Sequence, residues 1–358
     1  MVDQASGAQV GVKVGAKSDT GSNKPGKYLV QLTARAYTHK RASGYQVAVL
    51  KPKLDRLSVT FPVDDEDARK AIRHHLAQLA ASDAQPVTVW KKASDWGSQK
   101  YDRSYRLEVT PKASVLVQCA SAKSSVSLLR FEFNPDQISP GGVHAFRQAV
   151  PLLTAGHYDY QALACCGRVS RIDIAVDLVN IDIEDMLIAT AKPSATSGYF
   201  GVTGKAETKY LNQKKGGSKL YVYDRRARLE KLHAEGKGEP SEFGEAKYTR
   251  VEIRTEANIP IVDIPNMSNR LLKLNIFDID AAAPPEQLHH WRLFQDSCRY
   301  RGLAGALALL PGEAKGAYKN AIMMSEPLWR PNELWSHWPA VVNDSGLLPS
   351  ANASCSDL

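Results

Sequence analysis

The spacing of apolar positions along the chain predicts three helical regions. Residues 65 to about 81 (DEDARKAIRHHLAQLAA) begin with acidic side chains and continue with apolar ones three and four positions apart, as in an amphipathic helix. A second helix is predicted from Gly142 to Leu153. From Pro285 onward the pattern is helical again and ends in a tryptophan-rich segment, which indicates an all-helical carboxy-terminal module.

Between these helices, short runs alternate apolar with polar residues, as half-buried strands do. Two pairs of runs are similar to each other. LDRLSVTF resembles VSRIDIAVD when Arg56 is set on Arg171, and LLRFEFN resembles YTRVEIR when Arg130 is set on Arg250; the offsets are 115 and 120 residues. Nearly equal offsets favour an α+β fold of two related halves, each with an antiparallel sheet and flanking helices.

These patterns divide the chain into five parts. The termini are rich in small and polar residues without apolar periodicity, as in disordered tails. The predicted parts are a disordered tail over 1–26, a first α+β half over 27–155, a second α+β half over 156–280, a helical module over 281–341 and a disordered tail over 342–358.

The charge and the apolar content narrow the classes of function. The chain has 358 residues, a net charge of +8 and a pI near 9.1, which favours a polyanionic partner such as nucleic acid. No apolar run approaches the roughly 18 to 20 residues that span a bilayer, and the amino terminus lacks the apolar core of a secretory signal. We therefore expect a cytoplasmic protein without a membrane partner. The absence of zinc-finger, Walker and Rossmann motifs argues against zinc, ATP and nicotinamide chemistry.

Three predicted strands place polar side chains on the face opposite their apolar one, because side chains alternate along a strand. In RIDIAVD the residues Ile172, Ile174 and Val176 form the buried set. The polar sets are Arg171, Asp173 and Asp177; Tyr221, Tyr223 and Arg225; and Arg250, Glu252, Arg254 and Glu256. If the strands are neighbours, one face of the sheet gathers carboxylates, tyrosines and arginines.

This set of side chains suits the cleavage of a phosphodiester. A tyrosine can attack phosphorus and keep a covalent bond to it, carboxylates can hold Mg²⁺ or Mn²⁺, and Arg250 or Arg254 can neutralise charge on the phosphate. Asp173 and Asp177 are four residues apart, roughly 13 Å along a straight strand, so we expect only one of them to share a metal with Glu252. The alternative is that these charges form nothing more than cross-strand salt bridges.

The positive charge is concentrated around the two tyrosines. Gly216 and Gly217 predict a hairpin turn between Tyr210 and Tyr221, which would bring basic residues beside the candidate site. The predicted DNA-binding residues are Lys209, Lys214, Lys215, Lys219 and Arg225. A basic rim around a nucleophile is what a DNA backbone requires. In the first half Ser58 stands where the second half has Asp173, so the predicted chemistry belongs to the second half.

Over about residues 50 to 340 the chain resembles the replication initiation factors of the Rep_trans type, which occur in rolling-circle plasmids and filamentous phages. The resemblance rests on LDRLSVTF, LRFEFNP, SRIDIAVDL, TKYLNQKKGGSKLYVYDR, TRVEIR and LWRPNELWSHWP, in this order. The FEFNP run and the tryptophan segment look most like phage proteins of the RstA kind. Asn212 stands where many relatives have Gly, and Arg225 where many have Lys.

The resemblance implies an endonuclease that nicks one strand at a replication origin, stays on the 5′ end through tyrosine, and ends the round by a second strand transfer. In such initiators the nucleophile lies in a run like YVYDR, which implies Tyr223, with Tyr221 as the second choice. We expect origin DNA, double- and single-stranded, a host helicase and a second copy of the chain as partners. The rival hypothesis is a non-catalytic, sequence-specific DNA-binding or regulatory protein whose tyrosines only pack.

Overall fold

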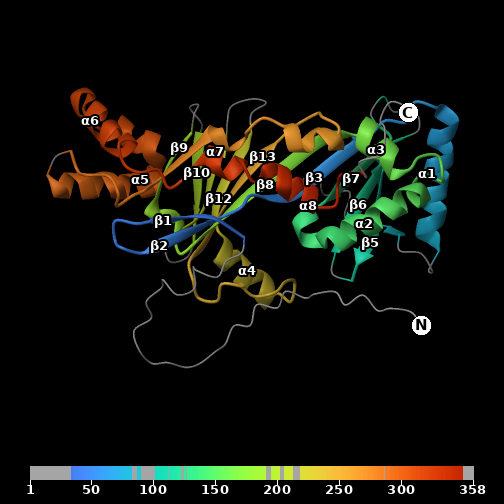
Figure 1. The fold of residues 1–358 in the computed structure, drawn as a ribbon, viewed down its shortest axis with the longest axis horizontal. Helices are drawn as coiled ribbons and strands as arrows, with labels where there is room; N and C mark the ends of the chain where they lie inside the picture. The colour runs from blue at the N-terminus through green and yellow to red at the C-terminus, as the bar shows by residue number, and fades with distance from the viewer. Residues whose placement is uncertain are drawn as a thin grey trace.

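The computed structural model describes residues 34–82, 87–89, 101–111, 113–121, 125, 127–190, 195–201, 205–212, 218–285 and 287–349. The fold is α+β, with a large antiparallel sheet and flanking helices (Figure 1). Ten strands follow one another in the order β10-β11-β12-β13-β8-β3-β7-β6-β5-β4, and β1 and β2 join the same sheet through β8. A separate small sheet pairs β9 with β14.

The elements fall into three groups along the chain. The amino-terminal hairpin and the first half comprise β1 (Arg35–Lys40), β2 (Gln46–Leu50), β3 (Lys53–Phe61), α1 (Glu66–Ala81), β4 (Val87–Val89), β5 (Arg103–Thr110), β6 (Ala113–Cys119), β7 (Leu129–Phe133), α2 (Pro135–Leu153) and α3 (Tyr160–Cys166). The second half comprises β8 (Arg168–Val179), the short 3-10 helix η3 (Ile183–Asp185), β9 (Met186–Thr190), β10 (Ala195–Phe200), β11 (Ala206–Asn212), β12 (Lys219–Asp224), α4 (Arg225–Ala234) and β13 (Tyr248–Thr255). The carboxy-terminal part comprises η4 (Ile261–Asn266), η5 (Leu271–Lys273), β14 (Leu274–Asp278), α5 (Leu288–Ala308), α6 (Gly312–Met323), α7 (Pro331–Trp335) and α8 (Trp338–Asp344).

The strand order confirms the two related halves. β3 and β8 lie side by side at the centre, followed outward by β7-β6-β5-β4 on one side and β13-β12-β11-β10 on the other. Arg56 pairs with Asp173, and Ser58 pairs with Arg171. In the alignment of the two halves Arg56 corresponds to Arg171 and Ser58 to Asp173, so each pairing is the equivalent of the other. The halves therefore share one continuous sheet, in which the two central strands are related by an approximate twofold axis.

The alignment of Arg130 with Arg250 is wrong by two residues. Arg130 pairs with Thr60, and the equivalent of Thr60 in the second half is Ala175, which pairs with Glu252. A shift of two residues keeps every side chain on the same face of the sheet. The polar and apolar faces of the two halves therefore still correspond.

The two helices predicted before the carboxy-terminal module are present, and both differ from the prediction only at their beginnings. α1 begins at Glu66 because the Asp65 side chain accepts a hydrogen bond from the Asp67 amide at 2.9 Å, which caps the helix. α2 begins at Pro135, earlier than the predicted Gly142, and bends at Ser139. The apolar periodicity starts only after this bend, because the two sides of a bend do not share one helical register.

The carboxy-terminal segment packs in two places. α5 and α6 have their own core, in which Trp291 and Phe294 contact Tyr318, and they project from one end of the sheet (Figure 1). α7 and α8 belong instead to the main core, where the indole of Trp338 donates to the Ile264 carbonyl at 3.0 Å. The predicted module is helical, but it does not form one unit.

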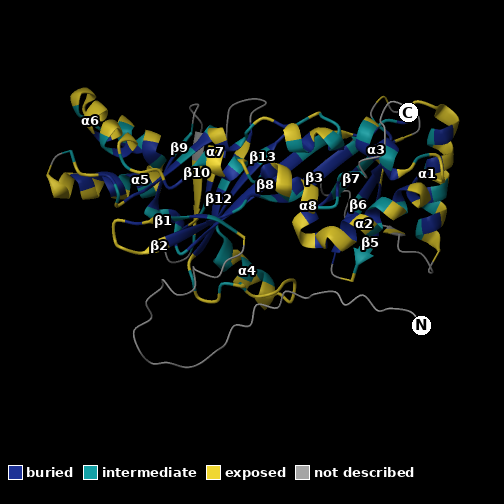
Figure 2. Cartoon of the chain, in the orientation of Figure 1, coloured by how far each residue is buried: buried dark blue, intermediate teal, exposed yellow. Residues whose placement is uncertain are grey.

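The prediction of a disordered tail from residue 342 is wrong as far as residue 349. α8 extends to Asp344, Leu347 is buried, and the Tyr160 hydroxyl donates to the Leu347 carbonyl at 2.6 Å. The main core to which this segment belongs follows the central strands of the sheet, which are mostly buried (Figure 2). Apolar side chains in this segment complete the core beside α2 and α3. The predicted tails over 1–26 and 350–358 lie outside the described residues. Within the described ranges, no helix has the length and apolar character needed to cross a bilayer.

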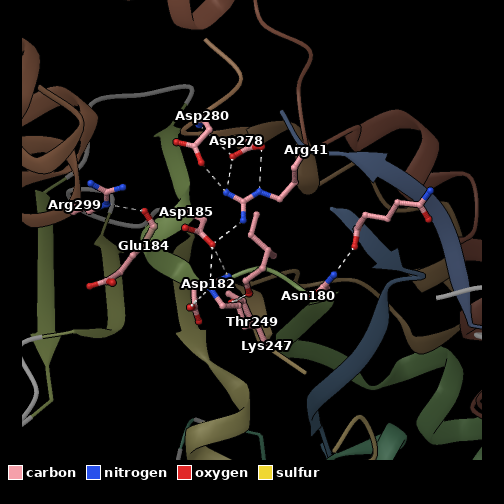
Figure 3. A network of polar contacts seen from close by, with 12 residues as sticks. Arg41, Asn180, Asp182, Glu184, Asp185, Lys247, Thr249, Asp278, Asp280 and Arg299 are labelled. Atoms are coloured by element: carbon pink, nitrogen blue, oxygen red, sulfur yellow. Dashed lines mark hydrogen bonds and ion pairs between the residues drawn. The ribbon is translucent and has the colours of Figure 1, made fainter. Parts of the chain in front are cut away.

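A cluster of charged residues joins β14 to the second half (Figure 3). Arg41, directly after β1, donates to Asp278 at 3.0 and 3.2 Å and to Asp185 of η3 at 2.8 Å. Lys247 contacts Asp185 from the other side at 3.5 Å, and Asp280 lies 3.3 Å from Arg41. One buried guanidinium therefore connects three segments that are far apart in the sequence.

Candidate active site

Strands β8, β13 and β12 are neighbours, and their polar side chains meet on one face of the sheet. Arg254 pairs with Asp173 across β13 and β8, and Glu252 pairs with Tyr221 across β13 and β12. Tyr223 lies opposite Arg250 in the same ladder. Directly paired residues project from the same face, so the arrangement predicted from alternation is present.

This face is polar but closed to solvent at its centre. The exposed fractions are 1% for Asp173, 0% for Asp177, 7% for Glu252 and 5% for Tyr223. Arginines form ion pairs with these carboxylates, and α4 packs against β13 with its Arg228 over the Tyr223 ring. Buried carboxylates require partners, and those partners distinguish the three acidic residues.

Asp177 has the partners of a structural carboxylate. Arg250 donates to both of its oxygens, at 2.6 and 2.8 Å, and the Tyr248 hydroxyl donates at 2.8 Å. Burial alone would raise the pKa of Asp177, but the charge of Arg250 and these hydrogen bonds hold it below its ordinary value. Asp177 therefore does not fit the metal site for which it was one of two candidates.

Arg250 is equally occupied. Its side chain is 3% exposed, and beside Asp177 it donates to Asp55 at 2.8 Å. The expectation that it contacts a phosphate does not fit this geometry, because both ends of its guanidinium are paired inside the sheet face. Arg254 is about one third exposed, so it is the arginine of the pair that a phosphate can reach.

Asp173 and Glu252 form the pair of carboxylates suited to a metal. Asp173 accepts from Arg171 at 2.9 Å and from Arg254 at 3.3 Å. Burial, and then the negative charges of Asp55 and Asp173, raise the pKa of Glu252 to about 7. Two acidic groups that resist ionising together are stabilised by a divalent cation or by a shared proton. Among the residues with described positions, no group of three or more His, Cys, Asp or Glu converges as a metal site, so this pair would supply two ligands.

The two tyrosines differ in what surrounds them. The Tyr223 hydroxyl lies 3.5 Å from Glu252 Oε2, the guanidinium of Arg228 lies 5.2 Å from its ring centre, and burial raises its pKa to about 12. Tyr221 is partly exposed, and the guanidinium of Arg254 lies 5.0 Å from its ring centre. Tyr223 therefore has the nearby carboxylate, and Tyr221 has the access to solvent.

The predicted basic rim is present only in part. Lys219 is exposed on β12, and Arg225 is partly exposed as the first residue of α4. Lys209 is 5% exposed, and burial lowers its pKa to about 8, so its prediction as a DNA-binding residue is wrong. Position 209 alternates to the opposite face, where its amine lies 3.4 Å from the Ile183 carbonyl. Lys214, Lys215 and the predicted Gly216-Gly217 turn lie outside the described residues.

The pattern of alternation missed two residues of the site. Asp55 should point to the apolar face, but the pairing of β3 with β8 is irregular between Leu54 and Arg56, and Asp55 reaches Arg250 instead. No local signal indicates such a bulge. Tyr248 is two residues before Arg250 and so shares its face; the alternation that identified Arg250 was sufficient to find it.

The comparisons with known proteins do not assign a family. No protein-family model matches the chain, and no curated protein matches it. A solved structure of a rolling circle replication initiator protein from Geobacillus stearothermophilus is similar, with 14% sequence identity and a TM-score of 0.35 over 72% of this chain and 99% of the other. A likeness at this level carries no argument about function.

Proposed function

We propose that this protein is a rolling-circle replication initiator that nicks one DNA strand at an origin and keeps the 5′ phosphate on a tyrosine. The observation that carries the proposal is the Tyr223 hydroxyl lying 3.5 Å from Glu252, on a sheet face shared with Asp173, Arg254 and Lys219. A tyrosine, a carboxylate pair and reachable cations are the side chains that transfer of a phosphodiester to an enzyme needs.

In the proposed reaction the tyrosine oxygen bonds to phosphorus, and the bond from phosphorus to the 3′ oxygen breaks. The tyrosine proton passes to Oε2 of Glu252, which leaves the other oxygen of this carboxyl group for a cation, and the released 3′ oxygen takes a proton to become a primer hydroxyl. Tyr223 is the first choice because of its distance to Glu252, and Tyr221 the second because of its exposure. Arg254 neutralises charge on the phosphate. Joining the 5′ phosphate to another 3′ hydroxyl reverses these steps at termination.

Asp173 and Glu252 would hold Mg²⁺ or Mn²⁺, and the rest of the coordination would come from water and the phosphate. A bound cation would polarise the phosphoryl oxygen and neutralise the carboxylate pair. Arg171 and Arg254 keep Asp173 in place for that role. We further propose a plasmid or phage origin as the DNA, a host helicase as partner, action in the cytoplasm, and a second copy of the chain because each round needs two cleavages.

The rival proposal is a DNA-binding protein that does not cut. The observation that favours it is the 5% exposure of Tyr223, together with the ion pairs that already occupy Asp173 and Asp177. In that case the tyrosines would be packing residues, and binding to origin DNA would weaken with salt but leave the strands intact.

A covalent-adduct assay separates the two proposals. The full chain is incubated with Mn²⁺ and a labelled single-stranded origin oligonucleotide, and the adduct is resolved under denaturing conditions. We expect an adduct with the wild type and a loss of about 100-fold or more with Tyr223→Phe, because the attacking oxygen is removed. Tyr45→Phe, at a tyrosine that is 50% exposed between β1 and β2, is the matched control.

The outcomes identify the nucleophile as well. If the adduct is lost with Tyr221→Phe and not with Tyr223→Phe, Tyr221 is the nucleophile, and the nicking proposal is intact. A wild type that binds the oligonucleotide but forms no adduct, with Mg²⁺ or with Mn²⁺, would refute nicking and support the non-catalytic protein. Open circles from a supercoiled origin plasmid give the same test on duplex DNA.

A further inference from the structure

The polar sheet face continues beyond β12 onto the last two strands, where it carries two more tyrosines. Tyr210 of β11 pairs with Tyr221. Tyr199 of β10 pairs with Thr208, which in turn pairs with Tyr223. Paired residues project from the same face, so four tyrosines share this end of the sheet, and the outer two lie within roughly 10 Å of the inner two, at about 4.8 Å per strand.

The two outer tyrosines are exposed to solvent. Tyr199 is 61% exposed and Tyr210 is 37% exposed. The rings of Tyr210 and Tyr221 are nearly perpendicular, with centres 5.6 Å apart and planes at 84°, so this contact covers at most one face of the Tyr210 ring. Tyrosine is common in strands because it packs well, but packing does not account for two rings that are exposed on the last two strands of a sheet.

Positive charge accompanies these rings. Lys219 is exposed on β12 and pairs with Arg254, and the guanidinium of Arg254 lies 5.0 Å from the ring centre of Tyr221. Aromatic rings beside a cationic track are how proteins bind single-stranded nucleic acid, because bases stack on the rings while the cations follow the phosphates. Duplex DNA keeps its base faces stacked inside and cannot use such rings.

We propose that Tyr199 and Tyr210 form a stacking platform for unpaired bases of single-stranded DNA, next to the phosphate bound at Tyr223 and Glu252. The inference rests on the proposed function and deepens it, since it says how the strand is positioned at the tyrosines. Bases are bound through their ring faces, so the platform contributes affinity and position and little sequence preference.

The test measures binding and does not require cleavage. A fluorescent oligodeoxythymidine and a blunt duplex of equal length are titrated with the full chain in EDTA. Tyr199→Ala/Tyr210→Ala should weaken binding of the single strand about fivefold or more, from the alanine effects typical of stacking, and should change duplex binding less than about twofold. Tyr199→Phe/Tyr210→Phe should bind like the wild type, because phenylalanine keeps the ring.

Tyr300 provides the matched control. It is 66% exposed on α5 and stacks on Phe200, whose ring lies over Gly198, on the side of β10 opposite Tyr199. Tyr300→Ala should leave binding of the single strand unchanged. A base analogue whose fluorescence falls on stacking should be quenched by the wild type and the phenylalanine variant, but not by the alanine variant. The slope of log affinity against log salt should stay constant, because no cation is removed.

Failure of the inference differs from failure of the proposed function. A wild type that binds the single strand, with an alanine variant that binds it equally well or loses duplex binding to the same degree, would overturn the platform alone. A wild type that binds no single-stranded DNA would overturn both.

Discussion

At the scale of single residues, the site is defined by how each buried carboxylate is neutralised. Asp177 has an arginine, a tyrosine hydroxyl and a nearby lysine, so its charge is fully compensated. Glu252 has Arg254 at 3.6 Å and the Tyr223 hydroxyl at 3.5 Å, both long contacts, and it also faces the acidic groups of Asp55 and Asp173. An uncompensated buried acid destabilises the folded chain when it ionises, and such groups are common where a protein binds cations or moves protons.

This imbalance predicts a dependence of stability on pH. The pKa of Glu252 is raised to about 7 from 4.5, so its contribution to stability is fully present below pH 4.5 and is lost as the pH rises through 7. Glu252→Gln cannot ionise and should escape that loss, which we expect to be roughly 1 to 3 kcal/mol between pH 4.5 and 8. Urea denaturation in EDTA at both pH values measures the difference between the two proteins.

Glu256→Gln is the control, because Glu256 is exposed just beyond the same strand. Adding Mn²⁺ at pH 8 should stabilise the wild type and not Glu252→Gln, since only the wild type has the charged pair. If the difference in free energy of unfolding between the wild type and Glu252→Gln is the same at both pH values, Glu252 is not protonated near neutral pH.

At the scale of elements, a strand and a helix meet at the tyrosines. β12 ends at Asp224, whose side chain accepts from the Ala227 amide at 2.9 Å and so caps α4. α4 has no buried residue, so it depends on this cap and on its packing against β13 more than a core helix would. The helix places Arg228 over the Tyr223 ring and presents a basic surface beside the site.

Removing the cap should loosen α4 without disturbing the sheet. Asp224→Ala should lower the stability of the helix by about 1 kcal/mol, which corresponds to roughly fivefold faster hydrogen exchange at its amides. Asp224→Asn should behave like the wild type, because asparagine caps equally well. Hydrogen exchange resolved by segment makes the comparison, and equal rates in the alanine and asparagine variants would show that the cap does not hold the helix.

Sequence alone predicts the elements and the shared face, but not the partners of each side chain. Alternation within β8, β12 and β13 is a local property, so it identified Asp173, Tyr223 and Glu252 correctly as sharing one face. Asp55 was missed because a bulge turned it. Lys209 was misassigned because η3 and the distant helix α5 cover its face. Partners depend on register and long-range packing, which short patterns do not contain.

At the scale of the whole molecule, one arginine connects the carboxy-terminal part to the second half of the sheet. Arg41 binds Asp278 of β14 and Asp185 of η3 (Figure 3), and Asp278 has no exposed surface. β14 also leads into α5, which packs on β9 and contacts β10. The strands that carry Tyr199 and Tyr210 therefore depend on a segment that this ion cluster holds in place.

Arg41→Met should leave Asp278 buried without its partner and destabilise the protein by about 3 to 5 kcal/mol. Arg41→Met/Asp278→Leu should recover much of that loss, because removing both charges removes the unpaired one. Urea denaturation measures the free energies. Limited proteolysis should cut Arg41→Met first within α5 and α6, before the sheet, since that part loses its connection. If the double variant is no more stable than Arg41→Met, the guanidinium stabilises the molecule through some contact other than Asp278, and the connection between β14 and the second half lies elsewhere.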